Sequence, residues 1–472
     1  MKSLYRITAA LFAASALVVP SIAAAQSQRA LDVRSEQAVK HWTPDRRAAA
    51  TPRDLVIDER GLGYLRARGG QLLPYGHAIA PLAKPGGGGD SAGPSVTAMT
   101  PANGATVGAA ATFSANVTDA SGVKSVTFYI RQGNGQAQSF AATGNGSLYA
   151  VNLSGFTNGA WSWYVVAKDN AKPGNTTTSA VASFTVDTSG GGGGGGGDDT
   201  VPNAEWGNGG TVQEAAGRIY FEMPANSRRK RWDGYVCSGT VVSDATTGRS
   251  IIITAAHCVY DDANKAFARN VLFIPNQAET SGTGTDLNCA NDPIGCWAPD
   301  FGVVDVNWTT RTFPDNVAWD YAFFVVPDSG AHSAGLASRP DALDAAVAPM
   351  SVSFSAPATG SVTHALGYSY DVDPQFMYCA DPMEQVDAAD WWLPNCGLSG
   401  GSSGGPWSQP FNVSTGNGPI ISVNSWGYTN QPGMAGPKLS GTSASCVFSR
   451  AKAQALGLPY ADGDAGLTVT NC

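Results

Sequence analysis

The sequence predicts an all-β protein with a β-sandwich followed by two antiparallel β-barrels. Short apolar and β-branched runs separated by turn residues recur along most of the chain, a spacing typical of antiparallel strands. Apart from one short helix expected near residues 449–456, no amphipathic helix alternates with these runs, which argues against a parallel sheet. Two glycine-rich segments divide the 472 residues into separate folding units.

The N-terminus has the pattern of a secretory signal peptide over residues 1–25. Lys2 and Arg6 precede an apolar stretch at residues 7–19, and three alanines end before Gln26. This is the order of a charged start, a short apolar middle and a small-residue cleavage site. The stretch is too short to span a bilayer, and no later segment reaches about 20 apolar residues. We therefore expect a secreted protein, extracellular or periplasmic, with no membrane span.

Residues 26–84 are polar, rich in Arg and Ala, and weakly patterned. Such a composition favours a segment without a core of its own. We interpret it as a prosegment that is removed or loosely attached, with a flexible spacer as the alternative. Glycine-rich linkers follow at residues 85–93 and 189–204, because runs of glycine have no side chains to pack and so separate folded units.

The segment between the linkers, residues 94–188, has the pattern of a β-sandwich. Its apolar residues alternate in short runs separated by turns such as residues 119–122 and 144–146, and several such strands within about 95 residues are typical of a sandwich. The segment contains no Cys and no His, so we assign it no catalytic role. We expect strands at residues 111–117, 123–130, 148–153, 161–167 and 180–186.

Residues 205–472 remain rich in short strands and contain all eight cysteines. In an exported protein an even number of cysteines indicates a disulfide framework, and no paired Cys-x-x-Cys points to zinc. We expect no metal and no cofactor, and the sequence leaves the pairing open. A net charge of −8 without a basic stripe argues against nucleic acid as a partner. We expect strands at residues 218–223, 239–242, 251–254, 271–274, 303–306, 321–326, 352–354, 363–367 and 420–425.

One histidine stands in a frame suited to catalysis. The β-run 251–254 leads into Ala-Ala-His-Cys at residues 255–258, where small alanines allow close packing behind the imidazole. A serine hydroxyl needs a neighbouring base to attack a peptide bond, and we expect His257 to be that base. The other histidines lack this frame, and they are His41, His77, His332 and His364.

A glycine-rich segment near the C-terminus contains the candidate nucleophile. The Gly-x-Ser-Gly-Gly pattern occurs twice in overlapping frames, around Ser399 and around Ser403, and only the second continues into Pro406. The second frame also matches the Gly-x-Ser-x-Gly elbow of α/β-hydrolases. In those enzymes the histidine follows the serine, and no histidine follows residue 364. The α/β-hydrolase reading is therefore excluded.

An acid must hold the imidazole in the correct tautomer and stabilise its protonated form. Asp320 heads the apolar run 321–326, while Asp305 lies in a strand and Asp315 in a turn. All three acids lie between the candidate base and the candidate nucleophile. The order of the groups is then His, Asp, Ser, which helps to identify the fold as well as the reaction.

At these residues the chain resembles the chymotrypsin-like serine endopeptidases, and more closely their bacterial secreted, glutamyl-endopeptidase-like members. The resemblance covers residues 205–472 and implies two antiparallel barrels that cleave protein or peptide substrates through an acyl-enzyme. Proline after the glycines favours Ser403 as the nucleophile, and Asp-hydrophobic-Ala before a strand favours Asp320 as the acid. The oxyanion donors are expected to be the N–H groups of Gly401 and Ser403, since glycines let the backbone turn toward one point.

The resemblance also implies one disulfide, between Cys237 and Cys258. A second pair, Cys289 with Cys296, would close a small loop. The remaining pairs follow mainly by elimination, and they are Cys379 with Cys396 and Cys446 with Cys472.

Four residues are expected at the substrate-binding cleft: Gly397, Ser425, Trp426 and Gly427. Gly397 stands six residues before the nucleophile, where tryptic members of the family carry an Asp, so specificity for Lys or Arg by that route is unsupported. The backbone of the other three should pair with the substrate as an antiparallel strand.

Activation is expected to differ from that of trypsin-like zymogens. Ser402 stands where those zymogens carry an Asp that pairs with the new N-terminus, and no Ile-Val-Gly-Gly start occurs near the domain boundary. We therefore expect activation by removal of residues 26 to about 200, with the cut in the second Gly linker.

The sandwich segment resembles bacterial immunoglobulin-like modules at Pro-Ala-Asn-Gly (residues 101–104) and at residues 119–123 and 126–129. Such a module implies a surface or polymer ligand. Two functions follow for the whole chain. The first is a secreted serine endopeptidase; the alternative is a secreted binding or adhesion protein whose protease-like domain is inactive.

Overall fold

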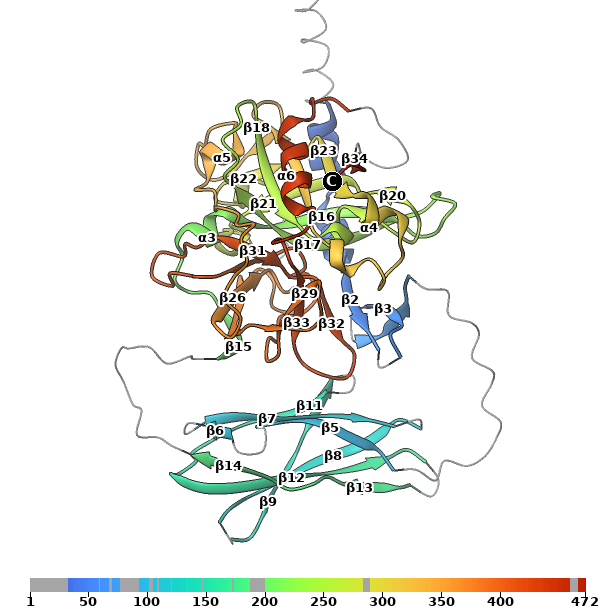
Figure 1. Ribbon diagram of the computed structural model, residues 1–472, viewed down its shortest axis with the longest axis vertical. Helices are drawn as coiled ribbons and strands as arrows, with labels where there is room; N and C mark the ends of the chain where they lie inside the picture. The colour runs from blue at the N-terminus through green and yellow to red at the C-terminus, as the bar shows by residue number, and fades with distance from the viewer. Residues whose placement is uncertain are drawn as a thin grey trace, which may run out of the picture. The chain divides into compact units, whose positions relative to one another are not determined.

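The computed structural model describes residues 33–58, 60–67, 70–76, 93–101, 105–107, 110–119, 121–133, 135–145, 148–171, 174–186, 200–282, 289–458 and 466–472. The chain divides into two units, the first made of residues up to 54, 200–426 and 434–472, the second of 55–199 and 427–433. The expected signal peptide, His77 and most of both glycine-rich linkers lie outside the described residues. Strands dominate both units (Figure 1), so the prediction of a mainly β chain is confirmed.

The largest sheet of the first unit positions His257 and Asp320, which lie just after β18 and just before β24. The parallel strand β1 (Thr51–Pro52) pairs with β17, off the main path of this sheet. The sheet has the spatial order β25 (His332–Ala334), β22 (Gly295–Trp297), β21 (Arg269–Pro275), β16 (Ala216–Pro224), β17 (Trp232–Val242), β18 (Arg249–Thr254), β24 (Ala322–Pro327), β23 (Phe301–Asp305) and β34 (Gly466–Val469).

Two smaller sheets contain most of the strands after residue 360. Most strands expected from the sequence form, but residues 352–354 make only an isolated bridge at Val352. Closure of the sheets into two barrels stays a prediction.

The first small sheet has the spatial order β15 (Val201–Glu205), β27 (Met377–Pro382), β26 (Val362–Gly367), β30 (Pro406–Ser408) and β31 (Ile420–Val423). The second contains β28 (Glu384–Gln385), β29 (Asp390–Leu393), β33 (Met434–Pro437) and β32 (Trp426–Tyr428).

Helices in the described residues are short. The C-terminal helix begins earlier than the expected 449–456, because Ala444, Val447 and Phe448 already form its buried face, and Phe448 packs against Phe323 of β24 at 5.1 Å between ring centroids. Besides a helical stretch at residues 33–41, the α-helices are α2 (Pro44–Ala49), α3 (Gly210–Ala215), α4 (Val306–Thr310), α5 (Leu343–Ala346) and α6 (Ala444–Ala453). None of the described helices is long and apolar enough to cross a membrane.

The segment that we interpret as a removed or loosely attached prosegment is packed in the first unit at residues 33–54, and its removal stays a prediction. This segment folds into the first unit, where Trp42 and Ala50 join a buried cluster with Tyr220, Val236 and Leu272. Its own hydrophobic pattern is weak because few apolar residues suffice when the partner strands supply the rest of the core. The next strands along the chain are β2 (Asp54–Ile57), β3 (Gly63–Arg66) and β4 (Leu72–Pro74).

All four predicted disulfides are present. They join Cys237 to Cys258, Cys289 to Cys296, Cys379 to Cys396 and Cys446 to Cys472, and the described chain has no free cysteine. Such a framework is typical of proteins that fold in an oxidising compartment.

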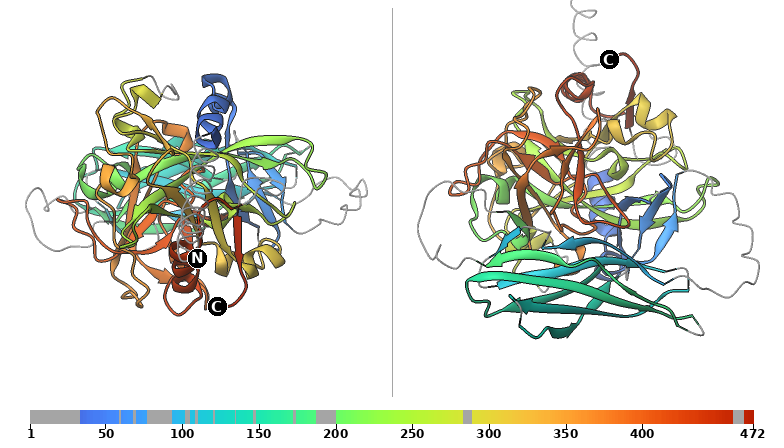
Figure 2. Two further views of the ribbon diagram at one scale, coloured as in Figure 1. Left: turned by 90° about the horizontal axis from the view of Figure 1, so that it is seen from above. Right: turned by 60° about the horizontal axis from the view of Figure 1, so that its bottom comes forward.

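The sandwich predicted between the linkers is confirmed. Its strands lie in two layers (Figure 2), and each run expected from the sequence lies within or overlaps a strand. One layer contains β10 (Thr143–Asn145), β11 (Leu148–Ser154), β7 (Ala110–Thr118) and β5 (Ser95–Thr100); the other contains β6 (Ala105–Val107), β14 (Ala182–Val186), β12 (Gly159–Asp169), β8 (Val123–Gln132) and β9 (Gln138–Ala141), with β13 (Thr176–Thr178) paired to β12.

Trp163 is the centre of the sandwich core. Its side chain is fully buried, its ring meets Phe113 and Phe128 edge-on at 5.1 and 5.4 Å, and its indole N–H donates to the Pro101 carbonyl at 3.1 Å. Both the apolar surface and the single polar atom of this side chain are therefore satisfied.

The substitution Trp163→Ala should lower the free energy of unfolding of the sandwich by about 3–5 kcal/mol, since it leaves a cavity at the core. Urea unfolding of residues 94–188 would measure this. Val181→Ala is the control, because Val181 is 53% exposed and its truncation should change stability by less than about 0.5 kcal/mol. Equal midpoints for the two variants would contradict the assignment of this core.

Candidate active site

His257 lies at the end of a buried strand. Strand β18 ends at Thr254, and the short 3₁₀ turn Ala256–Cys258 follows directly. Ala255 and Ala256 are fully buried, and their small side chains let the turn pack against the sheet. The disulfide from Cys258 to Cys237 of β17 ties this turn to the neighbouring strand, so the imidazole is held on two sides.

Asp320 pairs with His257, as the sequence predicted. Its Oδ2 lies 2.7 Å from the imidazole Nδ1, and its Oδ1 accepts the backbone N–H of His257 at 2.8 Å. The pair forms because β18 and β24 run antiparallel with Thr254 opposite Ala322, so the residues just after one strand and just before the other emerge at one end. Both side chains are fully buried.

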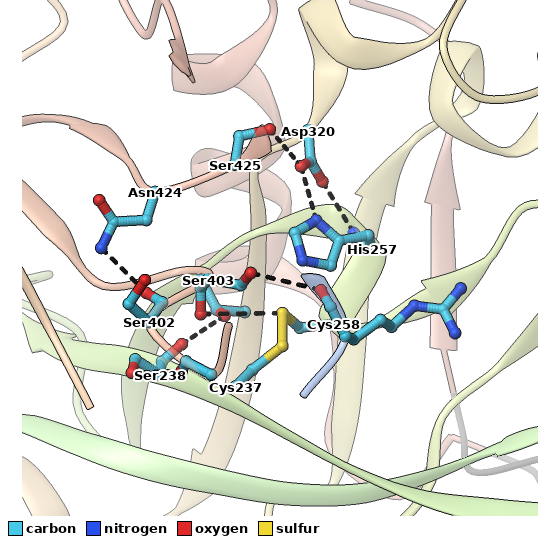
Figure 3. The surroundings of a disulfide bond; sticks show 12 residues. Cys237, Ser238, His257, Cys258, Asp320, Ser402, Ser403, Asn424 and Ser425 are labelled. Carbon is cyan, nitrogen blue, oxygen red and sulfur yellow. Dashed lines mark hydrogen bonds and ion pairs between the residues drawn. A yellow bond between two sulfur atoms is a disulfide. The ribbon is translucent and has the colours of Figure 1, made fainter. Parts of the chain in front are cut away.

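Ser425 holds the other side of this carboxylate. Its hydroxyl donates to Asp320 Oδ2 at 2.5 Å, as Figure 3 shows. The sequence placed Ser425 at the substrate cleft, and the structure gives its side chain a contact with the acid. Three hydrogen bonds therefore fix the position of the Asp320 carboxylate.

The loop of Ser403 is anchored on β17 by its backbone. Ser238 N–H donates to the Ser403 carbonyl at 2.7 Å, and Ser238 Oγ donates to the Gly401 carbonyl at 2.9 Å. The Cys258 sulfur lies 3.9 Å from the Ser403 carbonyl oxygen. The Ser403 loop therefore lies beside the turn that carries His257 (Figure 3).

Asn424 braces the same loop from its far side and was not among the sequence-predicted site residues. Its side-chain amide donates to the Ser402 and Leu366 carbonyls at 2.9 and 2.8 Å and accepts the indole N–H of Trp407 at 2.7 Å. The backbone carbonyl of Asn424 accepts the Gly404 N–H at 2.7 Å. In the sequence, the only sign of this role is that Asn424 directly precedes the expected cleft residue Ser425.

Gly404 is required by close packing. Its φ of +81° is one that residues with a side chain rarely adopt, and an added Cβ would lie 2.1 Å from Thr254 Oγ1 and 2.4 Å from the Ser238 carbonyl oxygen. The loop can therefore approach the strands β17 and β18 only without a side chain here.

The imidazole Nε2 is buried and has no hydrogen-bond partner within the described residues. This nitrogen is the one opposite to the Asp320 contact, and so the one available to accept a proton from a serine. The Ser403 hydroxyl donates to the carbonyl of Arg53 at 3.4 Å.

The competing residues have other partners. Asp305 caps helix α4, accepting the Asn307 N–H at 2.7 Å and the Ser443 hydroxyl at 2.5 Å. Asp315 lies in a turn, where its N–H donates to the Thr312 carbonyl at 2.9 Å. Neither is the acid seen on His257.

The remaining described histidines also lie elsewhere. His41 pairs with Glu222 at 3.0 Å, and His332 stacks on Trp297 with 4.0 Å between ring centroids. Burial lowers the pKa of His364 to about 4, so this side chain is neutral at physiological pH.

The other predicted cleft residues are placed as follows. Gly397 is exposed, and its N–H donates to the Pro202 carbonyl at 2.7 Å, while Asn203 donates to its carbonyl at 3.1 Å. Trp426 is buried and pairs with Ala435 of β33. Gly427 belongs to the second unit. The backbone N–H of Ser399, the alternative nucleophile, donates to Ser369 Oγ at 3.2 Å.

A metal ion is not implied by this cluster. The described residues with clustered ligand atoms are Cys237, His257 and Cys258, but the two sulfurs are joined in a disulfide. Disulfide sulfurs are not the thiolates that bind metals.

Asp390 of β29 is a buried acid that the sequence did not single out. Burial raises its pKa to about 8, the charges of Asp387 and Asp320 act in the same direction, and Lys438 and Trp426 oppose them. The side chain is therefore largely protonated at neutral pH.

The family match found among known proteins lies at the sandwich. Residues 94–194 match the bacterial Ig domain family, and the comparison with curated proteins gives no match. The fibronectin(III)-like modules of Clostridium thermocellum CbhA are 26% identical, with 20% of this chain and 94% of that chain covered and a TM-score of 0.16. CopC from Methylosinus trichosporium is 15% identical, covering 20% and 93%, with a TM-score of 0.17.

An endo-β-1,4-mannanase from Thermotoga petrophila is 14% identical, and the match covers 21% of each chain with a TM-score of 0.18. The chain thus spans about a fifth of the length of that enzyme.

The substitution Asp390→Asn should make stability less dependent on pH. The folded-state pKa of about 8 lies above the ordinary value of 3.8, so the contribution of the acid is fully present below pH 3.8 and is lost as the pH rises through 8. In urea unfolding, the free energy of unfolding of the variant minus that of the wild type should increase between pH 5 and pH 8. Glu384→Gln, at an exposed acid of β28, should show no such gain; a parallel pH profile for Asp390→Asn and wild type would contradict the prediction.

The substitution Gly404→Ala should destabilise the first unit more than Gly441→Ala does. Both glycines have positive φ, but Gly441 has no atom within 4 Å of an added Cβ, so it isolates the backbone strain of about 1–2 kcal/mol. The clash at Gly404 should add about 1–3 kcal/mol. Thermal unfolding midpoints would measure the difference, and equal midpoints would be the contrary result.

Proposed function

We propose that the first unit is a secreted serine endopeptidase with the chymotrypsin-like pair of barrels, in which Ser403 is the nucleophile, His257 the base and Asp320 the acid. The observation that carries the proposal is the buried Asp320–His257 pair, with contacts at 2.7 and 2.8 Å, placed beside the glycine-bounded loop of Ser403. A histidine that is oriented by a carboxylate and has its second nitrogen unpaired is suited to accept a proton.

The reaction begins with proton transfer from Ser403 Oγ to His257 Nε2 as the oxygen attacks the carbonyl carbon of a peptide bond. Asp320 keeps the Nδ1 proton in place and stabilises the imidazolium that forms. Ser425 fixes this acid by its hydrogen bond of 2.5 Å, so the base does not rotate away during the transfer.

The tetrahedral intermediate carries its charge on the former carbonyl oxygen. We assign its stabilisation to the N–H groups of Gly401 and Ser403, on a loop whose shape is held by Ser238 and Asn424. His257 then returns its proton to the leaving amine. Water, activated by the same base, hydrolyses the acyl-enzyme and restores the serine.

The four disulfides support an exported protein. The bacterial Ig-like domain at residues 94–194 supports a further role for the chain, since such a module can bind a surface or polymer ligand. We place that role beside proteolysis, because the module contains no residue of the triad.

A fluorophosphonate probe tests the proposal. This reagent forms a covalent adduct with an activated serine, so the secreted protein should be labelled at Ser403, as located by mass spectrometry of its peptides. Ser403→Ala and His257→Ala should abolish labelling. Asp320→Asn should reduce hydrolysis of a peptide substrate by about 10⁴-fold, because the imidazole loses its correct tautomer.

Ser399→Ala is the matched control, since it alters the overlapping motif and should keep full labelling. A labelled Ser399, or a peptide library left intact by the fully processed protein, would instead favour a binding or adhesion protein with an inactive protease-like domain.

A further inference from the structure

The proposed catalytic groups are covered. Ser403 is 5% exposed and His257 is fully buried, whereas a protein substrate must bring its backbone within about 3–3.5 Å of the nucleophile. Figure 3 shows a short blue stretch of the N-terminal chain passing next to Ser403. The Ser403 hydroxyl donates to the Arg53 carbonyl at 3.4 Å, so the segment that includes Arg53 covers Ser403.

The covering segment binds as an added strand. Of the eleven residues of β17, only Thr240–Val242 pair with β18, which leaves an edge before them. Strand β1 fills it: Thr51 and Pro52 pair in parallel with Tyr235 and Val236. Adding a strand to an exposed sheet edge is a common way for a protein to bind an extended peptide.

Complementary shape holds the segment against the nucleophile loop. A Cβ added at Gly400 would lie 2.7 Å from the Cβ of Pro52 and 2.8 Å from that of Asp54. The backbone at residue 400 is thus as close to the segment as a glycine allows, three residues from Ser403.

The side chain of Arg53 is also bound. It is 1% exposed, its guanidinium lies 3.8 Å from the carboxylate of Asp261, and it stacks over the ring of Tyr235 at 5.4 Å. A buried acid and an aromatic face are the groups that bind a basic side chain.

Anchors further upstream keep the segment in place. Trp42 is buried, and its indole N–H donates to the Asn270 carbonyl at 2.5 Å. Arg34 pairs with the buried Asp300 at 2.6 Å, and His41 pairs with Glu222. The contacts span β16, β21 and the residue before β23, so the segment docks on the unit at several separate points.

We propose that residues 33–54 are a built-in inhibitor, which lies along the edge of β17, covers Ser403 and keeps the protease inactive until the segment is removed. The inference rests on the proposed function. The contacts of the segment also indicate which substrate binds after its removal. This substrate is an extended peptide whose basic side chain occupies the site formed by Asp261 and Tyr235.

The segment is held in a form that resists cleavage. The Ser403 hydroxyl donates to the carbonyl oxygen of Arg53 at 3.4 Å, while hydrolysis requires the serine oxygen to approach the carbonyl carbon, with the carbonyl oxygen turned toward the N–H donors of the loop. A peptide bound with its oxygen on the nucleophile blocks the site without reacting.

Docking should weaken in acid. Burial opposes ionisation of Glu222, but hydrogen bonds from His41, Arg269 and Asn270 outweigh it and lower the pKa to about 2. A lowered acid pKa contributes stability above the ordinary value of 4.5, and this is lost as the pH falls toward 2. Hydrogen exchange at residues 33–41, corrected for intrinsic rates, should therefore lose protection between pH 4.5 and 2. Glu222→Gln should remove this dependence, and unchanged protection in the wild type would contradict the role of this anchor.

Labelling rates of the full chain with the fluorophosphonate probe test the inhibition. Trp42→Ala removes an anchor of the segment. Gly400→Ala adds a methyl group that clashes with Pro52 and Asp54, and it introduces no backbone strain because the φ of Gly400 is outside the left-handed region. Each should raise the rate of Ser403 labelling by roughly tenfold or more, since loss of a buried Trp or a direct clash reduces docking by more than one factor of ten. Lys40→Ala is the control, because Lys40 pairs with Glu36 on the exposed side of the same helix and should label at the wild-type rate.

Retained disulfides and a cooperative thermal transition show that each variant is folded, and either variant alone suffices for the test. Rapid labelling of the wild type, unchanged in both variants, would overturn the inhibition while leaving the protease intact. Folded variants that release residues 33–54, as seen by hydrogen exchange, yet never label at Ser403 would instead overturn the proposed function.

Discussion

The antiparallel ladder of β17, β18 and β24 is the constraint on which the rest of the site depends. It places the end of β18 opposite the beginning of β24, so that His257 and Asp320 meet although 63 residues separate them in sequence. The same ladder presents Ser238, whose two hydrogen bonds position the Ser403 loop. Without this register His257, Asp320 and the Ser403 loop would not lie at the same end of the sheet.

Burial turns these contacts into a rigid arrangement. The carboxylate of Asp320 receives three hydrogen bonds, and a buried charge is tolerated only when it is satisfied in this way. Close packing has the same effect on the backbone: Gly404 has no room for a side chain, and the Cys237–Cys258 disulfide ties the turn of His257 to β17. Preorganisation of this kind lowers the cost of bringing reacting groups together.

The N-terminal segment docks on the same unit. The edge of β17 and the small residue at position 400 form a surface that binds an extended chain, and in this structure residues of the same polypeptide occupy it. Tethering raises the effective concentration of such a ligand far above that of a free peptide. A segment with few apolar residues of its own can therefore remain docked, because its partner strands provide most of the buried surface.

Local patterns in the sequence were sufficient for the strands of the sandwich and for most strands of the first unit, because alternation of apolar residues depends only on which face of a strand is buried. They also identified His257, Asp320 and Ser403 as candidates, since each stands in a distinctive short motif. What only the tertiary structure decided is how distant segments meet. The brace at Asn424, the protonated Asp390 and the docking of residues 33–54 depend on contacts between residues far apart in the chain, and neither periodicity nor local composition contains that information.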